Sequence, residues 1–212
     1  MKITILIPMF FSFSLFSQKD LSSVVSSADV FYGYRLYSQS FYDQLNTVNK
    51  IRFDKPLQTT GVGLSGYFSS TAKMGWHGHL IYNQVIPQII YIQDTIKGKI
   101  TGFTFGAAFG RALKTKNESF ALLYCLGFNT GRLRMFDNQF LRQRNSFFSP
   151  KISIQPKIKI GKLALSFLIE YEYDISNPLW KKTLSASDNQ TQISNLRQSC
   201  ITGQVGLGYI LN

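Results

Sequence analysis

The stretch that most constrains the fold is residues 151–175, KISIQPKIKIGKLALSFLIEYEYDI, in which apolar and polar side chains alternate along the chain. Glycine and lysine at 161–162 divide it into two runs, so the segment predicts a β-hairpin with a two-residue turn. Isoleucine, leucine, phenylalanine and tyrosine share one face, while lysine, serine, glutamine and glutamate dominate the other. Because successive side chains of a strand point to opposite faces, this hairpin separates an apolar surface from a charged one.

The same alternation recurs after residue 28 and predicts eight strands. The runs lie at about 29–37, 58–68, 75–86, 97–112, 119–131, 151–160, 163–175 and 198–211. The connections between them are alternately long and short, which is typical of tight turns at one rim of a barrel and long loops at the other. The sequence therefore predicts an all-β fold, an eight-stranded antiparallel up-and-down transmembrane β-barrel, over residues 29–212.

The glycine content of the less bulky strand faces indicates which side is inside. In the run 97–112, Gly106 and Gly110 alternate with phenylalanines, and the alternation is out of phase at Ile100. Rows of glycine suit the crowded interior of a narrow barrel better than a water-facing surface. The bulky apolar face would then point outward, where a surface of that extent needs lipid. A soluble secreted lipocalin-like barrel, with the apolar face inside, is the alternative.

Aromatic side chains near both predicted rims fit the interfacial girdles of membrane barrels. The outward aromatic residues expected at the two rims are Phe68, Trp76 and Phe120 at the short turns and Tyr34, Tyr82, Phe128, Tyr171 and Tyr173 at the long loops.

The N-terminal residues predict export. Lys2, an apolar stretch at 3–16 and the small Ser17 describe a secretory signal peptide over residues 1–17, and 18–28 would form a periplasmic N-terminal segment. The formal net charge is +12. In an exported chain we expect that charge to meet phosphates or acidic glycans and not nucleic acid.

Taken together, these patterns resemble the small OmpA/OmpX-like outer-membrane β-barrel proteins, and the Ser-Gln ending of the signal resembles those of Bacteroidota. The resemblance covers the whole mature chain and rests on pattern, without a signature motif. It implies a porin-like membrane protein of the cell outer membrane, and we expect a monomer. Pro156 departs from the strand pattern, since it removes one ladder hydrogen bond, and we expect a bulge or bend there.

Polar side chains on the predicted inward faces would fill the lumen. The expected network contains Arg35, His77, His79, Lys151, Glu170 and Glu172. The two-residue turn sets Lys151 opposite Glu172, which predicts an ion pair between them, with Arg35 near one of the glutamates. Pairing is expected because an unpaired charge in a narrow lumen costs several kcal/mol.

Two pairs of residues suggest further chemistry, but only weakly. His77 and His79, with Glu170 or Glu172, could hold a metal ion or perform acid–base catalysis. Two histidines alone are a weak signal and no G-x-S-x-G motif is present, so we expect no catalytic residue, no metal and no cofactor. Cys125 and Cys200 would lie three strands apart, too far for a disulfide, which predicts two free thiols.

Basic residues concentrate in the predicted long loops. They are Arg132, Arg134, Arg142 and Arg144 in the segment 131–148 and Lys181 and Lys182 in the last loop. We expect them to meet outer-membrane lipid and lipopolysaccharide phosphates, or a surface glycan or protein partner. The predicted function is that of a non-enzymatic membrane scaffold or surface-interaction protein. A lipid A-modifying barrel enzyme and a small pore are the alternatives.

Overall fold

The computed structural model describes residues 24–43, 51–52, 55–69, 74–92, 96–117, 119–137, 140–176, 181–182 and 197–211. Its long strands are β1 (Val24–Tyr37), β3 (Leu57–Ser69), β4 (Met74–Ile92), β5 (Ile96–Lys114), β6 (Phe120–Asp137), β7 (Phe140–Ile160), β8 (Leu163–Glu172) and β10 (Cys200–Ile210). Two short strands are added, β2 (Ile51–Arg52) on β4 and β9 (Lys181–Lys182) on β7.

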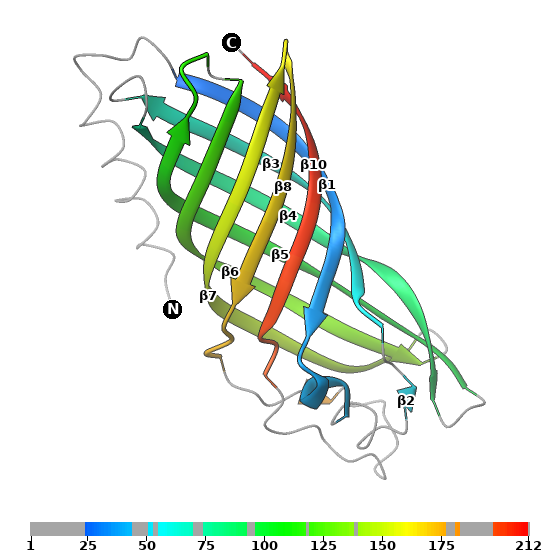
Figure 1. Cartoon of the computed structure of the whole chain (residues 1–212). Helices are drawn as coiled ribbons and strands as arrows, with labels where there is room; N and C mark the ends of the chain where they lie inside the picture. Colours follow the sequence, from blue (N-terminus) through cyan, green and yellow to red (C-terminus); the bar gives the residue numbers. More distant parts are fainter. Residues whose placement is uncertain are drawn as a thin grey trace.

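Each long strand pairs antiparallel with its neighbours in sequence, and β1 also pairs with β10, so the sheet closes on itself (Figure 1). The predicted eight-stranded up-and-down barrel is therefore confirmed. Within the described ranges, no helix is long and apolar enough to cross a membrane. The predicted signal peptide at 1–17 lies outside the described residues.

Several strands are longer than the sequence predicts. β1 begins at Val24, which pairs with Phe68, so the predicted periplasmic segment 18–28 in part belongs to the barrel. The predicted loop 131–148 is instead the outer part of the β6–β7 hairpin, paired up to Asp137 and Phe140. Arginines in this segment suggested a loop, but the inward–outward alternation continues through them, and backbone pairing follows the alternation. Figure 1 shows this hairpin and the β4–β5 hairpin extending past the other strands.

The outward face is apolar, as predicted. Exposed large side chains cover it from rim to rim, including Leu64, Ile154, Ile169 and Leu207 at roughly half exposure or more. The predicted girdle residues with described side chains follow this pattern: Tyr34, Tyr82, Tyr171, Tyr173, Trp76 and Phe120 are exposed, and Phe128 stacks on the exposed Phe148. The side chain of Phe68 lies outside the described set.

The inward face combines small residues with a partly apolar filling. Gly106 and Ala108 of β5 are buried, and Ile100 points inward with them, so the phase of this strand does not break. Further apolar side chains fill the interior toward the long-loop end, namely Leu57, Val85, Leu133, Met135 and Phe147. The interior is thus less uniformly polar than the sequence suggests.

Pro156 produces no bulge, contrary to expectation. The β7–β8 ladder omits Pro156, but the register is the same on both sides of the gap. Proline removes one donor, and its fixed φ is compatible with an extended strand, so no extra residue is needed. The register shifts lie elsewhere, between Val85 and Gln88 of β4 and between Met135 and Phe136 of β6.

Gly110 of β5 faces inward where two strands approach closely. A Cβ at this position would press on the Tyr124 carbonyl oxygen and lie 2.7 Å from the Cα of Cys125, both backbone atoms that cannot rotate away. We expect Gly110→Ala to lower the free energy of unfolding by about 1–3 kcal/mol. The matched control is Gly203→Ala, where a Cβ meets nothing within 4 Å. Urea unfolding in lipid vesicles measures both, and equal stabilities would contradict the packing argument.

Candidate functional site

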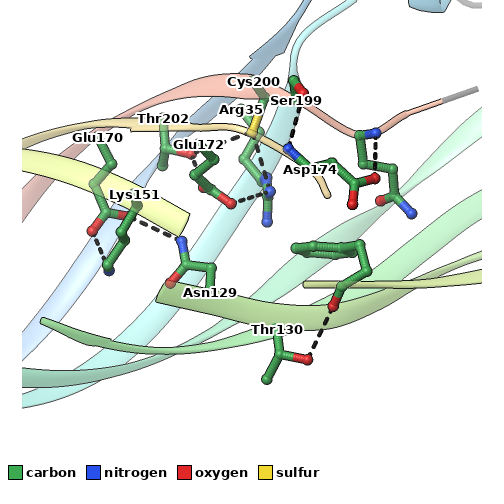
Figure 2. Close-up of polar contacts among 12 residues, drawn as sticks. Arg35, Asn129, Thr130, Lys151, Glu170, Glu172, Asp174, Ser199, Cys200 and Thr202 are labelled. Carbon is green, nitrogen blue, oxygen red and sulfur yellow. Dashed lines mark hydrogen bonds and ion pairs between the residues drawn. The ribbon is translucent and has the colours of Figure 1, made fainter. Parts of the chain in front are cut away.

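Buried ion pairs organise the barrel interior (Figure 2). The pair nearest the long-loop end joins β1 to β8: Arg35 Nη2 donates to Glu172 Oε2 at 2.8 Å. The other carboxylate oxygen accepts from Thr202 Oγ1 at 2.9 Å, and the guanidinium also contacts Cys200 Sγ at 3.1 Å. Both charged side chains are almost fully buried, at 2% and 1% exposure. The charge on Glu172 is therefore neutralised in a buried ion pair that links β1 to β8.

The second pair joins Lys151 of β7 to Glu170 of β8. Asn129 Nδ2 donates to the other oxygen of Glu170 at 3.4 Å. The predicted register is confirmed, since Lys151 does lie opposite Glu172. The predicted Lys151–Glu172 ion pair is wrong, because Glu172 is taken by Arg35 and the lysine reaches the diagonal neighbour instead.

A third pair was missed from the sequence. Lys157 Nζ lies 3.1 Å from Asp29 Oδ1, and Ser27 and Ser65 donate to the other carboxylate oxygen at 2.8 and 3.2 Å. The alternation of the sequence already places Lys157 on the same strand face as Lys151, which indicates that Lys157 points into the lumen. What the sequence did not indicate is that β1 and β7 face each other across the lumen.

The two histidines lie in the same interior. His79 Nδ1 and His77 Nε2 are 3.4 Å apart, and His79 Nε2 is 3.9 Å from Glu170 Oε1. The structure thus brings Glu170 to the histidines, while Glu172 is engaged with Arg35. Both cysteines are free and buried, as predicted, and Cys125 lies beside the histidine pair.

A basic surface lies on the outside of the β6–β7 hairpin. Arg134 is directly opposite Arg144 in the ladder, and β9 pairs Lys181 with Arg144 in turn. Arg132 lies one outward position before Arg134 on β6, and its Nε donates to Ser146 Oγ at 3.0 Å. Arg144 is exposed, and the other two arginines are half-buried. We call Arg132, Arg134 and Arg144 the arginine cluster.

Nothing described neutralises this cluster. Among the side chains that the structure describes, no carboxylate forms an ion pair with any of its three members. The side chains of Arg142, Lys181 and Lys182 lie outside that set. Like charges directly opposite in a ladder are destabilising, so the arrangement favours an anionic partner.

Comparison with known proteins gives the fold. No protein-family model and no curated protein matches the sequence. A major outer membrane protein of Thermus thermophilus has a similar structure, with 7% identity, a TM-score of 0.53, and coverage of 89% of this chain and 100% of that one. Ail, the attachment invasion locus protein of Yersinia pestis, has 12% identity, a TM-score of 0.51, and coverage of 89% and 98%. The fold is that of small outer-membrane β-barrels.

A second structure of Ail holds the heparin analogue sucrose octasulfate. It has 12% identity to this chain, a TM-score of 0.50, and coverage of 89% and 98%. At such identities the likeness extends to the fold alone.

Proposed function

We propose that this chain is a monomeric outer-membrane β-barrel that acts without enzymatic activity, as a surface-interaction protein, and that its arginine cluster binds lipopolysaccharide phosphates. The observation that carries the proposal is that Arg134 and Arg144 lie directly opposite each other on an outward strand face, without a carboxylate partner among the described side chains. Guanidinium groups match phosphate geometry with two parallel hydrogen bonds, so neighbouring arginines suit such an anion.

The position of the arginine cluster along the barrel axis supports a lipid headgroup as the ligand. Phe148 lies two outward positions closer to the centre of β7 than Arg144, and it stacks on Phe128 at 5.5 Å between ring centroids. Aromatic girdles lie at the membrane interface, so cations immediately beyond one face the headgroup layer. A sulfated or acidic surface glycan is the second candidate, because Ail, which has a similar fold, binds a polysulfated ligand.

The interior supports neither alternative activity. Glu170 and Glu172, the carboxylates expected near the histidines, each form an ion pair with a cation, which leaves them poor general bases. Both pairs lie in the barrel interior together with the buried Leu133 and Phe147, so side chains occupy space that a pore would need.

The test replaces the cluster in one variant, Arg132→Gln/Arg134→Gln/Arg144→Gln. We expect the affinity for lipopolysaccharide to fall at least about tenfold, since hydrogen bonds to charged groups contribute about 1.5–3 kcal/mol each. The matched control, Lys116→Gln/Lys159→Gln/Lys162→Gln, removes the same charge from exposed positions near the short turns. Calorimetric titration of the detergent-solubilised barrel measures both.

Two further titrations identify the ligand. Lipopolysaccharide lacking the lipid A phosphates should bind wild type as weakly as the variant binds the native lipid. Equal affinities of the variant and its control for the native lipid would refute lipopolysaccharide binding. If the arginine variant loses affinity for heparin-like glycans but not for lipopolysaccharide, the arginine cluster is a glycan-binding site instead.

A further inference from the structure

We propose that His77, His79 and Cys125 bind a thiophilic transition-metal ion, Zn²⁺ or Cu(I), inside the barrel. One ligand atom from each residue lies within 4.8 Å of the others, and all three side chains are buried. Imidazole nitrogen and thiolate sulfur are the donors that zinc and copper(I) prefer. The proposal is independent of the arginine cluster, which lies on the outer surface.

The strands bring the three residues together through a glycine. His77 of β4 pairs with Gly110 of β5, which pairs with Cys125 of β6, so the three positions form one row across the sheet. Gly110 has no side chain to separate the imidazole from the thiol. His79 follows His77 on the same strand face and points into the same space. The arrangement therefore joins β4 and β6, which are not neighbours.

The spacing of the nitrogens fits a tetrahedral ion. Two nitrogens bound at about 2.0–2.1 Å lie about 3.3 Å apart in tetrahedral geometry. The observed separation between His77 Nε2 and His79 Nδ1 is 3.4 Å. A sulfur bound at about 2.3 Å would lie about 3.6 Å from each nitrogen. One ligand atom of each residue lies within 4.8 Å of the others, so small side-chain movements would bring three ligands to one ion.

The remaining polar atoms of the two rings lack a structural role. His77 Nδ1 and His79 Nε2 are buried without a hydrogen-bond partner among the described residues. These are not the proposed ligand atoms, so no described hydrogen bond outside the histidine pair holds either ring away from a bound ion. His79 Nε2 lies 3.9 Å from Glu170, which places a carboxylate behind the proposed ligand. Carboxylates in that position orient metal-binding histidines.

The charges nearby permit a cation. Lys151 and Lys157 lie in the same interior, but each is paired with a carboxylate, Glu170 and Asp29 respectively. On binding, the Cys125 thiol loses its proton to solvent and contributes one negative charge. A Cu(I) site would then be neutral and a Zn²⁺ site would carry a single positive charge, with a fourth position left for another ligand.

The experiment measures metal in the folded chain. Wild type is refolded in detergent with Zn²⁺, with Cu(I) under anaerobic reducing conditions, or with Co²⁺ as a spectroscopic probe, and is then passed over a weak chelator. We expect about one ion per chain by mass spectrometry for Zn²⁺ or Cu(I), and a thiolate-to-metal absorption band with Co²⁺. Cys125→Ser and His77→Gln should each lower retention at least about tenfold.

The matched control is Cys200→Ser, which removes the other buried thiol and should retain the ion. The chain has two cysteines, so a thiolate band in this variant can come only from Cys125. That measurement decides the question even if the other variants do not fold, as judged by heat-modifiable migration. The proposal would be overturned if folded wild type retained less than about one tenth of an ion per chain with each of Zn²⁺, Cu(I) and Co²⁺. Undiminished binding by folded Cys125→Ser would do so too.

Discussion

Replacing Glu172 with leucine is expected to lower the free energy of unfolding by about 3–5 kcal/mol, because it leaves a buried charge without its partner. Arg35 is 2% exposed, and its guanidinium donates to Glu172 at 2.8 Å. With the carboxylate removed, the contacts of the guanidinium among the described residues are with the Cys200 sulfur and two aromatic rings. Urea unfolding of the barrel in lipid vesicles, followed by tryptophan fluorescence, measures the loss.

The double variant Arg35→Met/Glu172→Leu separates the charge effect from the packing effect. Replacing both members of a buried ion pair with apolar residues is often neutral or stabilising. We therefore expect the double variant to recover most of the stability lost by Glu172→Leu. If the double variant is as unstable as the single one, packing and the Thr202 hydrogen bond, rather than the orphaned charge, would explain the loss.

Ile154→Arg is expected to lower the stability of the barrel in lipid by about 2–4 kcal/mol, the usual effect of arginine at the bilayer midplane. Ile154 is 49% exposed on the outward face of β7, between the Phe148 girdle and the short turn at the end of the strand. If the outward face met water, an arginine there would change the stability by less than about 0.5 kcal/mol. The variant therefore tests which solvent surrounds the barrel.

Ile160→Arg is the matched control, since it makes the same replacement on the same face of the same strand, at 67% exposure beside the turn. Near the interface the loss should be only about 0–1 kcal/mol. Equal effects of the two variants would contradict a membrane-embedded belt.

Much of the fold was predictable because it depends on local pattern. The period of two identified the eight strands and the outward face of the 151–175 hairpin, and Gly161, with a φ of 61°, makes the predicted two-residue turn. Strand lengths were less predictable, because charged residues in the outer half of a hairpin look like a loop. In the β6–β7 hairpin, Arg132 and Arg134 remain in the ladder since their inward neighbours Leu133 and Met135 are buried.

The candidate sites were predictable in composition but not in pairing. All six expected lumenal residues are buried, yet Lys151 pairs with Glu170, and the pair Asp29–Lys157 was not foreseen. Cys125 was considered only as a disulfide partner, because nothing in a single strand indicates that it lies beside His77.

The amino-acid sequence alone specifies which residues share a strand face and which residues face each other across a hairpin, because both follow from alternation and turn length. It does not specify which residues meet across strands that are distant in the chain. Closure of β1 onto β10 makes that choice, bringing Arg35 to Glu172 and Asp29 to Lys157. The stagger of the strands and the missing side chain at Gly110 then bring Cys125 to the histidines. These contacts depend on the curvature and register of the whole barrel, which no short stretch of sequence contains.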